Sequence, residues 1–176
     1  LNWKTYGSEV GDESAKLAQE AGHQVFVGEL LDANYPNNFF DVVTLWDSLE
    51  HIHNPLESLS DIYRIIKPNG KIYISVPNYG SWYARLFKDQ WFMFTAPLHY
   101  YHYTDKTLSN LLAKSGFKDV SIEHPLGDTG FAQTIATVVA GRKLLKSIVQ
   151  SRLINFLLKV LNFLMPKGHL LAVATK

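Results

Sequence analysis

The sequence predicts an α/β domain built on a doubly wound, mostly parallel sheet. Apolar runs of strand length alternate with helical patterns over the first two-thirds of the chain, as is typical of parallel sheets. Several of these runs end in acidic residues. A length of 176 residues, 47% of them hydrophobic, suits one domain with one packed core.

The first part of the chain predicts two short strands around one helix. Residues 3–9 are predicted to be the end of a strand, and residues 24–27 are predicted to form the next strand. Asp12 is expected to cap a helix that runs to Ala21, because Asp is a strong N-cap and this stretch has one apolar face. Gly22 follows where a glycine commonly ends a helix.

The middle of the chain predicts a strand, a helix and another strand. Residues 41–46 form a buried apolar run. Pro55 starts a helix, because proline suits the first helical turn, and its apolar face continues to Ile66. Residues 68–70, Pro-Asn-Gly, predict a turn, and the β-branched character of residues 71–76 predicts a strand.

The last part predicts two helices and two strands. Thr104 caps a helix that Gly116 ends, and a strand over residues 117–124 follows. Residues 144–165 predict a long amphipathic helix, and residues 170–174 a final strand.

Charge is distributed unevenly along the chain. Residues 1–128 hold ten Lys or Arg and all sixteen Asp and Glu, a net charge of −6, whereas residues 129–176 carry +7. The basic end therefore favours an anionic partner or docks on its own acidic domain. The amphipathic basic insertion, about residues 131–165, is compatible with peripheral membrane contact through 144–165, with packing on the sheet, or with a homodimer.

Acidic residues stand at three predicted strand ends. Glu9 ends the first strand, Glu29 follows the second and Asp47 follows the third. Ligands of open α/β sheets bind outside the carboxyl ends of the strands, where an acid accepts hydrogen bonds from a ribose. Together the three acids predict a nucleoside site.

At this point the chain resembles the class I S-adenosylmethionine-dependent methyltransferases of the type 11, 12 and 23 groups. The resemblance covers about residues 4–125, with residues 170–174 as an antiparallel last strand of a Rossmann-like sheet. It rests on these segments: YGSEVGDESAKLAQEAG at 6–22, VGELLD at 27–32, FFDVVTLWDSLEHIHNP at 39–55, LSDIYRIIKPNGKIYISVPN at 59–78 and APLHYYHYTDKTLSNLLAKSGF at 96–117.

The resemblance implies S-adenosylmethionine as cofactor and assigns roles to residues at the strand ends. It implies ribose binding at the end of the first strand, adenine binding after the second and contact with the methionine end after the third. The corresponding residues are Glu9 and Val10, then Glu29 and Leu30, then Trp46 and Asp47.

The substrate side is expected to include His51 and His99 as catalytic residues, because an imidazole titrates near neutrality and suits a base. Glu50, His102 and Trp91 join them, with the aromatic segment 79–103 as the substrate-side element. The alternative is that His99 and His102 are structural. The other histidines are expected in surface or turn positions: His23, His53, His124 and His169.

A metal is not expected. In ubiquinone-biosynthesis O-methyltransferases an acid-x-x-Glu-His element is linked to a divalent cation, and Asp47, Glu50 and His51 fit that spacing loosely. The favoured alternative is that Glu50 and His51 cap and orient the loop.

The family's first strand and glycine-rich loop do not precede Glu9 in this sequence. Residues 1–176 are therefore expected to form a single, N-terminally incomplete domain with unpaired strand edges. We expect this chain alone to bind S-adenosylmethionine weakly or not at all and to be inactive.

The predicted function is S-adenosylmethionine-dependent O-methylation of a small-molecule or carbohydrate-like acceptor. The alternative is a degenerate or truncated methyltransferase fold that acts as an association module. Nucleic acid is not expected as a partner, because only Arg85 and Lys88 lie among the aromatic residues. The lack of cysteine fits a cytoplasmic protein, and a membrane-peripheral location is the alternative.

Overall fold

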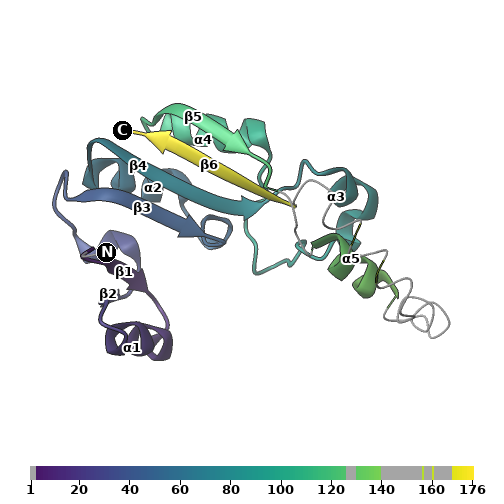
Figure 1. The fold of residues 1–176 in the computed structure, drawn as a ribbon, viewed down its shortest axis with the longest axis horizontal. Coiled ribbons are helices and arrows are strands. Elements are labelled where there is room, and N and C mark those ends of the chain that lie inside the picture. The colour runs from purple at the N-terminus through teal and green to yellow at the C-terminus, as the bar shows by residue number, and fades with distance from the viewer. Residues whose placement is uncertain (1–2, 126–129, 140–155, 157–159, 161–167) are drawn as a thin grey trace.

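The computed structural model describes residues 3–125, 130–139, 156, 160 and 168–176. Its described strands form two sheets (Figure 1). The smaller sheet pairs β1 (Tyr6–Glu9) with β2 (Gln24–Val27) in parallel, joined by helix α1 (Asp12–Glu20). The larger sheet has the order β3-β4-β6-β5, with these bounds: β3 Phe40–Trp46, β4 Ile66–Pro77, β6 His169–Thr175 and β5 Lys118–Glu123.

The larger sheet combines both strand directions. β3 runs parallel to β4, whereas β6 lies between β4 and β5 and is antiparallel to both. The antiparallel last strand is therefore confirmed. β6 pairs along its whole length with β4, from Lys71 opposite Thr175 to Pro77 opposite His169.

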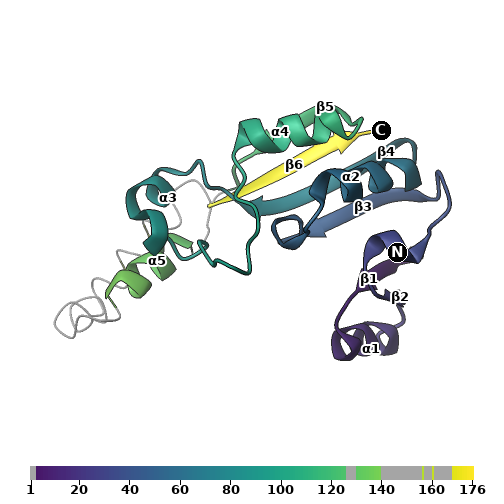
Figure 2. The same ribbon diagram turned by 180° about the vertical axis from the view of Figure 1, so that it is seen from behind.

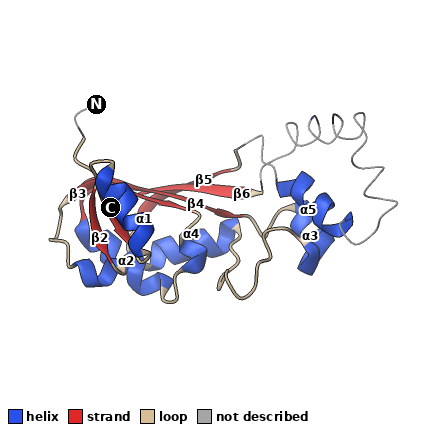
Figure 3. Cartoon of the chain, turned by 90° about the horizontal axis from the view of Figure 1, so that it is seen from below, coloured by secondary structure: helices blue, strands red, loops and turns tan. Residues whose placement is uncertain are grey.

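Helices α2 (Pro55–Ile65) and α4 (Asp105–Lys114) lie together on one face of the larger sheet (Figures 2 and 3). Alternate residues of β6 are buried, as expected of a strand with one face against the core. The core joins the helices and strands through fully buried apolar side chains, among them Leu59, Ile62, Ile72, Ile74, Leu108, Leu112, Leu170 and Ala172.

The aromatic segment 79–103 has a small core of its own. Helix α3 (Trp82–Phe87), the short 3-10 helix η3 (Lys88–Gln90) and helix α5 (Gly130–Val139) lie beyond the carboxyl end of β4 (Figure 1). Their cluster contains Tyr83, Ala84 and Trp91, all nearly inaccessible to solvent. The Phe92 N–H donates to Thr134 Oγ1 at 3.2 Å, which ties α5 to this segment.

Strands β1 and β3 each have one unpaired edge in the part of the chain that is described. β1 pairs with β2 and β3 pairs with β4, and the two sheets share no ladder. A cluster of rings holds the small sheet in place: Tyr6, Tyr35, Phe39 and Phe40, with Tyr6–Phe39 centroids 5.3 Å apart. The unpaired edges agree with the expectation from the sequence.

Two predicted boundaries were wrong. Asp12 is the first residue of α1 and not its cap: Gly11 holds the cap position and provides no side-chain acceptor. Ile66 does not continue α2, because its extended backbone begins β4. The predicted turn at residues 68–70 is a bulge inside β4, where the pairing shifts from Phe40–Ile66 to Val42–Lys71.

The other local signals worked as expected. Pro55 starts α2, and Thr104 caps α4 through a reciprocal capping box with Thr107. Gly116, which follows α4, has a φ of +102°, a conformation that suits glycine. Apart from Phe156 and Val160, the predicted helix 144–165 lies outside the described residues. Within the described part, no helix has the length and apolar character needed to cross a membrane.

Candidate functional site

The predicted ribose and adenine residues lie at the carboxyl end of the small sheet. Glu9 ends β1, and its Oε1 accepts from the Gly11 N–H at 2.7 Å, so the carboxylate closes the turn into α1. Glu29 follows β2 and precedes the 3-10 helix η1 (Leu30–Ala33). Leu30 packs against the main core, whereas Val10 is largely exposed.

The predicted methionine-side residues lie at the carboxyl end of β3. Trp46 is 57% exposed. Asp47 has a φ of +47° and donates its N–H to Ser75 O at 2.9 Å. Its Oδ1 lies 3.2 Å from His169 Nε2, at the start of β6.

The structure does not join these two groups by any contact. No hydrogen bond, ion pair or ring contact among the described residues connects Glu9 or Glu29 with Asp47. The small sheet lies beside the amino end of β3, whereas Asp47 follows its carboxyl end (Figures 1 and 2). The joint nucleoside site therefore stays a prediction.

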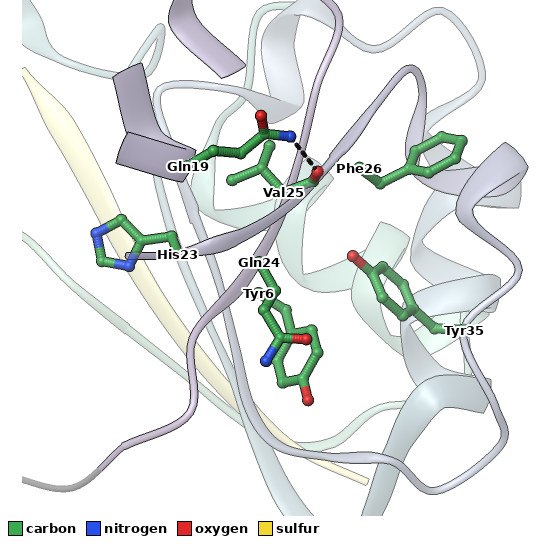
Figure 4. Close-up of a pocket in the computed structure, with 7 residues that line it drawn as sticks. All are labelled: Tyr6, Gln19, His23, Gln24, Val25, Phe26 and Tyr35. Atoms are coloured by element: carbon green, nitrogen blue, oxygen red, sulfur yellow. Dashed lines mark hydrogen bonds between the residues drawn. The ribbon is translucent and has the colours of Figure 1, made fainter. Parts of the chain in front are cut away.

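A hollow on the small sheet lies away from these acids. It is lined by Tyr6, Gln24 and Val25, near the amino ends of β1 and β2, and by Gln19, which donates to Val25 O at 2.9 Å (Figure 4). The predicted cofactor residues stand at the opposite strand ends, so this hollow is not the predicted site.

The predicted substrate-side residues come together beyond β3. Glu50 and His51 belong to the 3-10 helix η2 (Leu49–His51), and the Glu50 carbonyl accepts from the Tyr100 N–H at 2.9 Å. This bond brings the aromatic segment onto η2. The rings of His51 and His99 meet edge to face with centroids 4.7 Å apart.

Glu50, His51 and His99 form a compact polar group. One potential ligand atom from each of the three lies within 4.8 Å of the other two. Glu50 is only 1% exposed, and neither of its carboxylate oxygens has a hydrogen-bond partner in the part of the chain that the structure describes. Asp47, the first acid of the acid-x-x-Glu-His spacing, is not in this group.

Burial shifts the pKa values of two members of this group, Glu50 and His99. It raises the pKa of the Glu50 carboxyl, and the charge of Asp47 adds to the effect. It lowers the pKa of His99, and the neighbouring His51 lowers it further. It also lowers the pKa of His102. Neutral imidazoles can accept a proton or bind a metal.

His102 and Trp91 lie inside the aromatic segment. His102 is stacked between Phe94, at 4.8 Å, and Tyr79, at 5.4 Å, and its Nδ1 is buried without a partner. Trp91 is 1% exposed and packs near Tyr79 and Tyr83. Trp91 is therefore a core residue in this structure, and its substrate-side role stays a prediction.

The family follows from comparison with known proteins. Residues 2–122 match a family model described as a methyltransferase domain (type 23). The chain belongs to this family. Its fold is that of the class I methyltransferases, as the resemblance implied.

Two solved structures agree with this methyltransferase fold. A SAM-dependent methyltransferase from Archaeoglobus fulgidus is 20% identical, with a TM-score of 0.65, and the match covers 97% of this chain and 75% of that one. A possible histamine N-methyltransferase from Thermotoga maritima is 15% identical, with a TM-score of 0.68, and the match covers 98% and 72%.

Two curated relatives of the methyltransferase domain have quinone-related names. A demethylmenaquinone methyltransferase of Geobacillus sp. is 31% identical over 64 residues, 36% of this chain and 27% of the relative. A 2-methyl-6-phytyl-1,4-hydroquinone methyltransferase of Spinacia oleracea is 27% identical over 101 residues, 57% of this chain and 27% of the relative. The chain therefore spans under one-third of the length of these relatives.

His169 is the site residue that the sequence missed. A surface or turn role was expected, yet its Nε2 lies 3.2 Å from the Asp47 carboxylate in the methyltransferase domain. The sheet order could have indicated this contact, because an antiparallel last strand starts where the neighbouring parallel strand ends. His169 indeed pairs with Pro77 at the carboxyl end of β4.

Proposed function

We propose that this methyltransferase domain transfers a methyl group from S-adenosylmethionine to a hydroxyl oxygen of a small acceptor, at the group formed by Glu50, His51 and His99. The observation that carries the proposal is the position of these three side chains beyond the carboxyl end of β3, next to Trp46 and Asp47. Ligands of such sheets bind at this end.

The chemistry is an in-line displacement. An electron pair of the acceptor oxygen forms a bond to the methyl carbon, the carbon–sulfur bond breaks, and S-adenosylhomocysteine leaves with the sulfur electron pair. The hydroxyl proton passes to a base of this group, an imidazole of His51 or His99 or the Glu50 carboxylate, and from there to water. His99 and His51 are therefore the proposed catalytic residues, with Glu50 and His102 on the substrate side.

The names of the matched relatives favour a hydroquinone-like acceptor over a saccharide. We expect the protein produced from its complete gene to transfer isotope-labelled methyl from S-adenosylmethionine to hydroquinones and other phenols more than to saccharides. Nuclear magnetic resonance of the product would locate the methyl group. Exclusive labelling of carbon or nitrogen would contradict O-methylation.

The 176-residue chain alone is expected to bind S-adenosylmethionine weakly. The reason is that Glu9 and Asp47, its proposed ribose-side and methionine-side acids, lie at the ends of strands in separate sheets. Isothermal titration calorimetry should detect no saturable binding at micromolar concentrations. A micromolar dissociation constant for this chain would contradict the expectation.

A second candidate is a non-catalytic association module. It is favoured by the unpaired edges of β1 and β3 and by exposed apolar side chains on β2 and β3: Phe26, Val27, Val42 and Trp46. Sedimentation that shows a stable homodimer, with no methyl transfer by the protein from the complete gene, would favour this candidate. A cytoplasmic location and peripheral membrane contact through residues 144–165 remain predictions.

A further inference from the structure

We infer that Glu50, His51 and His99 bind one divalent transition-metal ion, with His99 in the place where the sequence suggested Asp47. The inference rests on the proposed function, since an ion at this group would meet the acceptor oxygen. The proposed site differs from the acid-x-x-Glu-His spacing in one ligand. That ligand is His99, which belongs to the aromatic segment and lies 48 residues after His51 in the chain.

The two histidines are oriented as metal ligands. His51 Nδ1 lies 2.9 Å from Leu98 O, and His99 Nδ1 lies 2.9 Å from Met93 O. A carbonyl oxygen only accepts, so each Nδ1 carries the proton and each Nε2 keeps a free electron pair. Ligating histidines commonly use such a bond to a backbone carbonyl to set tautomer and ring orientation.

The Glu50 carboxylate supplies the charge. It is 1% exposed, and neither oxygen has a hydrogen-bond partner among the described residues. A buried carboxylate that lies close to two imidazoles and accepts no hydrogen bond is unfavourable unless it takes up a proton or a cation. The ligand atoms lie within 4.8 Å of one another, yet Glu50 makes no direct hydrogen bond to either histidine. An ion with bonds of about 2 Å would fit such a gap.

Asp47 is engaged elsewhere. Its carboxylate contacts His169 at 3.2 Å, its backbone N–H is bound to Ser75, and it is absent from the group of potential ligands. Two imidazole nitrogens and one carboxylate oxygen favour ions such as Zn²⁺, Co²⁺ or Mn²⁺ over Mg²⁺ or Ca²⁺. Three protein ligands also leave a position open for an acceptor oxygen.

The test measures metal binding without cofactor or acceptor. The chain is freed of metal with EDTA, desalted and titrated with Zn²⁺ by calorimetry and with Co²⁺ by visible absorption. We expect one ion per chain and a Co²⁺ absorption band typical of nitrogen and oxygen ligands. Glu50→Gln and His99→Phe should each weaken Zn²⁺ binding more than about tenfold, because even supporting residues contribute that much.

Two variants serve as controls. Asp47→Asn removes a nearby charge but no ligand and should weaken Zn²⁺ binding less than about tenfold. His23→Gln, just before β2, should bind Zn²⁺ like the unchanged chain. Circular dichroism confirms that each variant is folded. An equal loss of Zn²⁺ affinity in Asp47→Asn and His99→Phe would contradict the choice of His99 over Asp47 as the third ligand. Absence of Zn²⁺ binding by the unchanged chain would overturn the metal site itself.

The result separates this inference from the proposed function. If the protein from the complete gene binds no Zn²⁺ but transfers methyl groups in EDTA, the metal site is refuted and the methyl transfer stands. If the chain binds Zn²⁺ through His99 but the complete protein transfers no methyl group, the metal site stands and the proposed function is refuted.

Discussion

Replacing Glu50 by glutamine is expected to raise the free energy of unfolding of the metal-free chain by about 1–3 kcal/mol at neutral pH, and to slow methyl transfer about 100-fold. The native state buries the Glu50 carboxylate with both oxygens unpartnered, and its pKa is raised by burial. Ionisation therefore costs the folded state more than the unfolded chain, where water solvates the charge. The neutral amide of glutamine avoids this cost of burying a charge. It also lacks the negative charge that the carboxylate contributes to the site.

Urea denaturation in EDTA and steady-state kinetics of the protein from the complete gene measure the two effects. Glu123→Gln is the matched control, because Glu123 is an exposed acid at the end of β5 and should change neither quantity noticeably. A less stable Glu50→Gln chain would mean that the carboxylate has a stabilising partner in solution. Unchanged kinetics would remove Glu50 from the site.

Replacing Leu59 by alanine is expected to lower the free energy of unfolding by about 2–5 kcal/mol. Leu59 lies on α2, is fully buried and belongs to the main core between the helices and the larger sheet. Truncation removes apolar contacts and leaves a cavity that the packed neighbours fill only in part.

Leu56→Ala is the matched control for this experiment. Leu56 lies on the same helix but is 46% exposed, so its truncation should cost less than about 1 kcal/mol. Urea denaturation of the two variants compares them directly. Equal destabilisation would contradict the packing of α2 through its Leu59 face.

The local elements of the fold could largely be predicted from the sequence. The capping box at Thr104 and the proline at the start of α2 act within a few residues, so their sequence signals are complete. The wrong predictions concern residues whose backbone conformation depends on pairing with a neighbouring strand. Ile66 continues the apolar face of α2 but pairs with Phe40, and residues 68–70 are absorbed into β4 as a bulge.

The candidate site was only partly predictable. Glu50 and His51 stood out because they follow an apolar run of strand length, where a parallel sheet places its polar residues. The predicted burial of that run was wrong, because β3 is an edge strand with only exposed and half-buried residues. Their link to His99 depends on the hydrogen bond from Tyr100 to the Glu50 carbonyl, which folds the aromatic segment back onto η2. The contact of His169 with Asp47 likewise depends on sheet order.

By itself, the sequence determined the α/β class, the order of the strands and helices, and the polar residues at the strand ends, because each depends on periodicity and end signals within one short stretch. Only the tertiary structure decided which of those residues meet. It placed His99 with Glu50 and His51, and it paired Asp47 with His169. The reason is physical: contacts between distant segments depend on how loops pack over a sheet edge, and no local pattern in either segment encodes its partner.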